Sequence, residues 1–143
     1  MTNIVSMPGQ VVILIATAFI EKNGKFLVLQ RSDKNLTNRG TWQLPEGKVR
    51  PGEKLLKTLR RELIEETGLM LVNAKLFGVH SSIMKEAHRM FRVMRVVFKC
   101  KTMGKIKLSK EHKDYKWVTL NNKVDYIEGF DPKNIISVKK VKL

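Results

Sequence analysis

The sequence has little of three things: cysteine, long apolar runs and negative charge. Its one cysteine, Cys100, excludes an intramolecular disulfide and any cysteine-rich metal site, so nothing requires an oxidising compartment. The longest apolar run, residues 11–20, is too short for a membrane helix, which needs roughly twenty residues. Residues 1–10 carry no Lys or Arg, unlike the start of a secretory signal. These absences predict a cytoplasmic protein with no membrane partner.

Acidic residues are scarce beside basic ones. The chain has 13 Asp and Glu against 28 Lys and Arg, a formal net charge of +15. Such a surplus favours an anionic partner, for example a nucleotide or a nucleic acid. The length of 143 residues fits one domain, and 43% hydrophobic residues suffice for a packed core. We therefore expect a single folded domain over residues 1–143.

Apolar stretches rich in β-branched residues predict a sheet. Residues 11–20 and 26–30 flank Asn23-Gly24, a strong signal for a hairpin turn. Further strands are expected at residues 76–80, 90–101, 105–108 and 115–120.

Two helices are expected beside the strands. Residues 54–67 contain no Gly or Pro, carry leucines at helical spacing, and precede Gly68, which is well placed to end a helix. A second helix is predicted to begin with Asp131 as N-cap and Pro132 at the first helical position. Its apolar side would consist of Ile135, Ile136, Val138 and Val141, with Lys139, Lys140 and Lys142 near its end. The pattern predicts an α/β fold, a mixed β-sheet sandwiched between α-helices.

Three glutamates of the first expected helix share one side. With Glu62 at zero, Glu66 lies at about +40° and Glu65 at about −60° around the helix axis. Any one of them alone is more simply read as a solvated surface residue. Together they repel one another, and a hard divalent cation such as Mg²⁺ or Mn²⁺ would turn that repulsion into attraction. Such ions also bind phosphate groups, so the pattern favours metal-assisted chemistry on a phosphate.

The whole stretch from Gly47 to Leu69 resembles the signature of the Nudix hydrolases, G-x5-E-x7-R-E-U-x-E-E-x-G-U, with U a bulky aliphatic residue. All specified positions match: Gly47, Glu53, Arg61, Glu62, Leu63, Glu65, Glu66, Gly68 and Leu69. The resemblance implies a single domain of the Nudix fold, the α/β/α sandwich, with its box at residues 47–69. It also implies hydrolysis of a nucleoside diphosphate linked to another moiety, with Mg²⁺ or Mn²⁺ as cofactor.

The resemblance implies roles for individual residues. The implied metal ligands are Glu62, Glu65, Glu66 and the carbonyl of Gly47. Arg61 matches an arginine that orients a glutamate of the box, and Glu53 is its expected partner. The general base stays open between Glu62 and Glu111, which precedes the strand expected at 115–120. Glu111 has two further readings, as a metal ligand or as a solvated loop acid.

A shorter resemblance bears on the substrate. Residues 130–134 look like a segment of the MutT subgroup, which sanitises oxidised purine nucleoside triphosphates and uses an asparagine here to bind the base. Asn134 is the candidate, since a carboxamide both donates and accepts; otherwise it is an ordinary first-turn residue. Four arginines, Arg31, Arg39, Arg92 and Arg95, are candidate phosphate contacts, or else solvated charges, and Arg31 and Arg92 are the two chosen. Glu46 stands where many relatives have glycine, which weakens substrate assignment by analogy.

These readings leave several functions in view. The first is a MutT-like pyrophosphohydrolase that converts a nucleoside triphosphate to a monophosphate and pyrophosphate. The same chemistry would also serve a dinucleoside polyphosphate, a nucleotide sugar or the 5′ end of an RNA. A function of another class is a non-catalytic module that binds nucleotides or RNA. The expected partner is a nucleotide polyphosphate, RNA is an open possibility, and either a monomer or a homodimer is compatible with the sequence.

Overall fold

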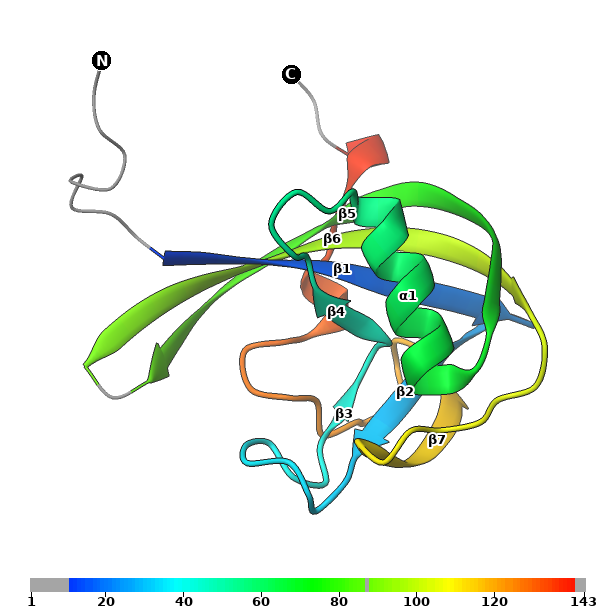
Figure 1. Cartoon of the computed structure of the whole chain (residues 1–143), viewed down its shortest axis with the longest axis horizontal. Helices are drawn as coiled ribbons and strands as arrows, with labels where there is room; N and C mark the ends of the chain where they lie inside the picture. The colour runs from blue at the N-terminus through cyan, green and yellow to red at the C-terminus, as the bar shows by residue number, and fades with distance from the viewer. Residues whose placement is uncertain (1–10, 87, 141–143) are drawn as a thin grey trace.

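The computed structural model describes residues 11–86 and 88–140 (Figure 1). In those residues, strands are arranged in the order β3-β2-β1-β6-β5-β8, with β4 paired to β1 and β7 paired to β2. The strands are β1 (Val11–Lys22), β2 (Lys25–Arg31), β3 (Trp42–Gln43), β4 (Glu46–Lys48), β5 (Met70–Glu86), β6 (Arg89–Met103), β7 (His112–Val118) and β8 (Ile136–Ser137). The pair β1–β6 is parallel and the other strand pairs are antiparallel. The predicted mixed sheet is confirmed.

The α-helix α1 (Leu55–Thr67) covers one face of this sheet (Figure 1). It ends where the sequence predicts, at Gly68, whose φ of 72° is left-handed and whose N–H donates to the carbonyl of Ile64. Within the described residues, no helix combines the length and the apolar character that crossing a bilayer requires.

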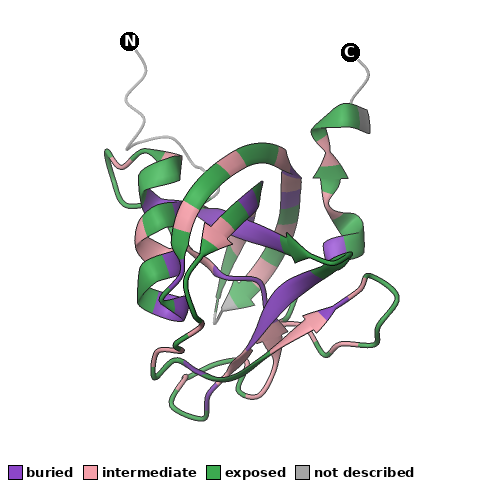
Figure 2. Cartoon of the chain, turned by 90° about the vertical axis from the view of Figure 1, so that its right-hand side faces the viewer, coloured by how far each residue is buried: buried purple, intermediate pink, exposed green. Residues whose placement is uncertain are grey.

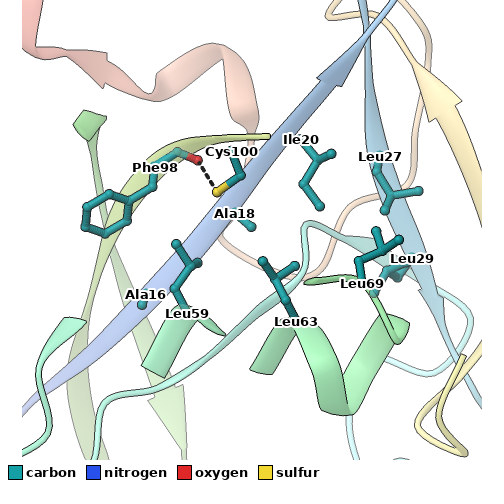
Figure 3. Packing of buried hydrophobic residues seen from close by; sticks show 10 residues of the cluster. All are labelled: Ala16, Ala18, Ile20, Leu27, Leu29, Leu59, Leu63, Leu69, Phe98 and Cys100. Carbon is teal, nitrogen blue, oxygen red and sulfur yellow. Dashed lines mark hydrogen bonds between the residues drawn. The ribbon is translucent and has the colours of Figure 1, made fainter. Parts of the chain in front are cut away.

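The core between α1 and the sheet explains why the helix lies there. Leu59 and Leu63 are on the side of α1 that faces β1, where Ala16 and Ala18 are fully buried (Figure 3). Because alanine side chains are short, the helix can pack closely on the centre of the sheet. Figure 2 shows the burial along β1 and along the inner side of α1. This packing fixes the position of the polar side of α1, which carries the glutamates.

The predicted second α-helix is wrong. The chain instead forms a 3-10 turn, η2 (Pro132–Asn134), then β8, then a second 3-10 turn, η3 (Val138–Lys140). The expected start is present, since the Asp131 carboxylate accepts from the N–H of Lys133 at 2.9 Å. Beyond it, Ile136 pairs with Val79 of β5, and a sheet edge suits such β-branched residues better than a helix does. Val141 and Lys142, assigned to the expected helix, lie outside the described residues.

Two other strand predictions need correction. Residues 105–108 are not a strand; Ile106 and Leu108 pack against the core while the N–H of Lys107 donates to the carbonyl of Thr67. The strand expected at 76–80 is part of the longer β5, which pairs with β6 along its whole length. The strand begins at Met70, where apolar residues such as Met70 and Val72 are exposed, so the hydrophobic pattern did not indicate where it starts.

Cys100 provides a simple test of the packing. It lies buried in β6, with its sulfur 3.4 Å from the carbonyl oxygen of Phe98, and burial raises the pKa of its thiol to about 12. Because the thiolate is the reactive form, we expect no reaction with a disulfide reagent at pH 8 in the folded protein. One thiol per chain should react after denaturation in guanidinium. Fast labelling of the native protein would contradict this placement of β6.

Candidate active site

A cavity of about 480 Å³ lies where β4, α1 and the segment before β7 meet. We call it the carboxylate cavity. Its lining includes Arg31, Glu46, Gly47, Arg61, Glu62, Glu66, Arg95 and Glu111. β4 reaches this position because it pairs with β1, with Gly47 opposite Ala16. The cavity therefore gathers residues from both ends of the box and from outside it.

Gly47 lies directly against the side chain of Glu62. A Cβ placed on Gly47 would overlap the carboxyl carbon and the Cγ of Glu62. A glycine is thus required here because of the close approach of β4 to α1. The contact puts the backbone of Gly47 beside a carboxylate.

Arg61 connects the loop before α1 to the glutamates on it. Its Nε and Nη2 donate to the two carboxylate oxygens of Glu53, at 3.2 and 2.9 Å, and its Nη1 donates to Glu62 at 2.6 Å. Thr58 also donates to Glu53. These contacts, that of Arg61 foremost, lower the pKa of Glu53 to about 2. Glu53 is therefore ionised near neutral pH and anchors the guanidinium beside Glu62.

Glu66 is the most buried acid of the cavity, with 3% of its surface exposed. Its Oε1 accepts from the N–H of Glu46 at 3.2 Å, whereas its Oε2 has no hydrogen-bond partner among the described residues. Burial raises the pKa of Glu66 well above its usual range, and the charges of Glu62, Glu46 and Glu111 add to the rise. A buried carboxylate oxygen with no partner and crowded by other acids is a position that a cation would stabilise.

His112, at the start of β7, contacts the same carboxylate. Its Nδ1 lies 3.7 Å from Oε2 of Glu66, and both side chains are buried. Burial, with a smaller effect of the charge on Arg31, lowers the pKa of His112 to about 4. The imidazole is thus neutral near pH 7.

Glu46 is neutralised by a buried arginine. The Nε of Arg95, in β6, donates to both carboxylate oxygens of Glu46 at 3.0 and 3.2 Å, and Thr17 makes a further contact at 3.4 Å. The guanidinium carbon lies 5.0 Å from the ring centre of Phe130. Nη1 of Arg95 has no hydrogen-bond partner among the described residues, although it is buried. The cavity lining therefore includes a buried ion pair between Glu46 of β4 and Arg95 of β6.

The sequence singled out Arg92, whereas Arg95 is the β6 arginine that lines the cavity. The two are three positions apart, so they point to opposite faces of the strand. Arg92 donates to Ser81 at 2.9 Å. The acid at position 46 was the available signal, because a carboxylate on an inward-facing strand needs a cation nearby.

Two candidate residues line the cavity from loops. The backbone of Glu111 is held by Ser32 and Asn35, which donate to its carbonyl at 2.9 Å each, and its side chain is exposed. Arg31 donates to Gln43 at 3.0 Å and to the carbonyl of Thr37 at 3.1 Å. Both residues are thus brought to the glutamates of α1 from distant parts of the sequence.

Two other candidates lie apart from the cavity lining. Glu65 is exposed, with its carboxylate 3.7 Å from Nη1 of Arg61. Asn134 is exposed in η2 and does not line the cavity. The segment just before Asn134 nevertheless contacts residues near the cavity. The N–H of Asp131 donates to Nε2 of His80 at 3.4 Å, and the ring of Phe130 packs against the guanidinium of Arg95.

The donors in the cavity fit a hard divalent cation in their chemistry. They are carboxylate oxygens of Glu62 and Glu66 and the backbone of Gly47, and such ions prefer oxygen ligands. In the described part of the chain, no three His, Cys, Asp or Glu side chains come close enough together to hold an ion by themselves. The Glu62 carboxylate is instead bonded to Arg61.

This arrangement and the comparisons with known proteins define the class. A family model for the NUDIX domain matches residues 11–134, and the chain belongs to this family of hydrolases. The signature residues 47–69 thus lie inside the matched region, which covers most of the chain.

Individual relatives support the same assignment. The chain is 36% identical to the MutT protein of Methanosarcina mazei Go1, for which a crystal structure is known. The match covers 80% of this chain and 81% of that protein's chain, and the two structures superpose with a TM-score of 0.66. A mutator MutT protein from Bacillus halodurans is 30% identical, with coverage of 76% and 69% and a TM-score of 0.60. Nucleoside triphosphatase NudI of Escherichia coli O1:K1 is 28% identical over 120 residues, which are 78% of this chain and 85% of the relative.

Proposed function

We propose that this Nudix hydrolase is a divalent-metal-dependent pyrophosphohydrolase of MutT type, which cleaves a nucleoside triphosphate to a monophosphate and pyrophosphate. The observation that carries the proposal is the buried, unpartnered oxygen of Glu66 in a cavity shared with Glu62 and the backbone of Gly47. The relatives named as MutT proteins and as a nucleoside triphosphatase support this choice of substrate class.

Glu62, Glu66 and the carbonyl of Gly47 would hold Mg²⁺ or Mn²⁺, and Glu65 is the further ligand that the family signature implies. A bound divalent ion supplies charge neutralisation for the phosphates and lowers the pKa of water. Arg61 has a positioning role: Glu53 fixes its guanidinium, which in turn restrains the Glu62 carboxylate. Glu62 would leave this hydrogen bond to reach an ion, while Arg61 stays on Glu53.

The general base has two candidates, Glu62 and Glu111. Glu111 is the better placed for proton transfer, because its side chain is exposed to the cavity while its backbone is held by Ser32 and Asn35. We expect Glu111→Gln to lower kcat by about 10²- to 10⁴-fold, the usual contribution of a general base. The concentration of Mg²⁺ that gives half-maximal rate should stay unchanged. An unchanged kcat would instead leave Glu62 as the base, and a raised Mg²⁺ requirement would make Glu111 a metal ligand.

The polyphosphate would bind beside the cations that line the cavity. Arg31 and Arg95 both face it, and Nη1 of Arg95 has a donor that no described residue uses. Arg92 and Asn134 do not line it, so roles for them in binding phosphate and base require a substrate that extends beyond the cavity.

A substrate panel tests the proposal. Canonical and oxidised nucleoside triphosphates, dinucleoside polyphosphates, nucleotide sugars and RNA with a 5′-triphosphate should be compared by kcat/KM with Mg²⁺ and with Mn²⁺. The proposal predicts the highest values for a nucleoside triphosphate. A bridged nucleotide or an RNA end as the best substrate would overturn it, and inactivity on the whole panel would favour a binding module.

Gly47 offers a test of the geometry at the glutamates. In Gly47→Ala the new Cβ would displace the Glu62 side chain, so we expect kcat/KM to fall by about 10²-fold, the size of effect that a misplaced catalytic group produces. Far-ultraviolet circular dichroism and the unfolding midpoint should change little, since the displaced group is a side chain at a cavity. The control is Lys57→Ala, at an exposed position of α1 outside the cavity lining, where alanine suits the helix. Full activity of Gly47→Ala would show that Glu62 need not stay where it lies.

A further inference from the structure

A second cavity of about 750 Å³ lies at the far ends of β1 and β6. These strand ends lie side by side in the parallel pair, on the right of Figure 1. None of the residues that line it also lines the carboxylate cavity. Its own lining combines positive charge with aromatic surface and includes Lys22, Lys101, Lys105, Tyr115 and Trp117.

The positive charge continues into a neighbouring hollow. That hollow shares Glu21 and Lys101 with the first and adds Lys75 and Lys99. Among the described residues lining the two, five lysines thus face one acid, and Glu21 is itself paired with Lys99 at 3.6 Å. We call this combined surface the lysine groove.

One exposed and one half-buried aromatic side chain line the lysine groove. Tyr115, in β7, is 42% exposed, and Trp117 follows two residues later on the same side of the strand. The ammonium of Lys22 lies 5.9 Å from the centre of a Trp117 ring. The groove therefore presents cations beside flat apolar faces.

We propose that the lysine groove binds single-stranded nucleic acid. A basic groove that follows the phosphates, with aromatic rings on which bases stack, is the usual combination in proteins that bind single strands without sequence preference. Unpaired bases are needed for such stacking, which disfavours a duplex as the occupant. The five lysines of the groove do not line the carboxylate cavity, so the proposed catalytic site does not account for their positive charge.

The test is fluorescence anisotropy with a labelled single-stranded RNA of about 12 nucleotides, within the usual site size. The RNA carries a 5′-hydroxyl, so the hydrolytic site has no phosphoanhydride to bind. In Lys22→Gln/Lys101→Gln/Lys105→Gln, we expect affinity at low salt to fall about tenfold or more. The slope of log affinity against log salt should become shallower by about 2, because three phosphate contacts are lost. Hydrolysis of a nucleoside triphosphate should be unchanged.

A control variant removes the same charge elsewhere. Lys34, Lys54 and Lys57 are exposed and line neither cavity, so changing these three to Gln should alter affinity by less than about twofold. Tyr115→Ala should weaken binding at least about fivefold through lost stacking. Equal losses in both triple variants, or no binding by the wild type at low salt, would overturn the proposal. The proposal would also be overturned if the variant at Lys22, Lys101 and Lys105 kept its affinity for RNA but no longer bound phosphatidylserine vesicles. That result would make the occupant of the groove a membrane surface.

Discussion

Replacing Glu66 by Gln is expected to lower kcat/KM by about two to four orders of magnitude, and Glu62→Gln should do the same. An amide keeps the shape of each side chain but removes the charge that would hold a divalent ion. In Glu66→Gln the unfolding midpoint should stay the same or rise. Burial and three neighbouring acids already raise the pKa of this carboxyl, so its ionised form is costly in the folded chain.

The measurement is steady-state hydrolysis at saturating and limiting Mg²⁺, with thermal unfolding of each variant as a check on folding. Glu21→Gln is the matched control, because Glu21 is exposed at the end of β1 and does not line the carboxylate cavity. It should keep wild-type kcat/KM. Near-full activity in both Glu62→Gln and Glu66→Gln would show that the proposed mechanism is wrong.

Arg95→Met is expected to lower the free energy of unfolding by about 3–5 kcal/mol. The substitution leaves the carboxylate of Glu46 buried without its cation, and an uncompensated buried charge is strongly destabilising. The side chains of both residues are almost fully buried, so solvent gives little relief. Urea unfolding followed by circular dichroism would measure the loss.

A second variant separates the ion pair from simple packing. Glu46→Gln/Arg95→Met removes both charges, so it should recover most of the lost free energy of unfolding. Equal stability of the single and double variants would contradict the account, because it would mean that Glu46 does not depend on Arg95 for its charge balance. Activity of the double variant would also report whether Arg95 contributes to substrate binding.

The sequence predicted the parts of the fold that local pattern determines. The helix over residues 55–67 and its end at Gly68 follow from leucine spacing and from the freedom of glycine at positive φ. The Asn23-Gly24 hairpin also forms as predicted, with Asn23 and Gly24 both at positive φ. In these places local preference and tertiary packing favour the same structure.

The last elements of the fold were decided by tertiary contacts instead. Asp131 and Pro132 do begin a helical turn, but pairing of Ile136 with Val79 of β5 takes the chain into a strand. No local pattern shows that an edge of β5 is available there. The apolar residues whose spacing predicted a helix therefore include Ile136, which forms part of the edge strand β8 instead.

Only those residues of the candidate site that belong to the signature at 47–69 could be predicted from the sequence pattern. Spacing on one helix placed Glu62 and Glu66 together, whereas the partners that surround them come from other strands. Arg95 reaches the cavity because β6 lies parallel to β1, with Arg95 opposite Ile15. A register between distant strands cannot be read from either strand alone, which is why the sequence led to Arg92 and not to Arg95.

The most direct test of the proposed function is the product stoichiometry of one good nucleoside triphosphate, resolved by mass. With Mg²⁺ present, the proposed reaction yields one monophosphate and one pyrophosphate for each triphosphate consumed. Removal of the ion by a chelator should stop the reaction, and Glu62→Gln protein prepared in the same way should form both products at least about a hundredfold more slowly. Release of a diphosphate and inorganic phosphate, or hydrolysis that persists without a divalent ion, would contradict it.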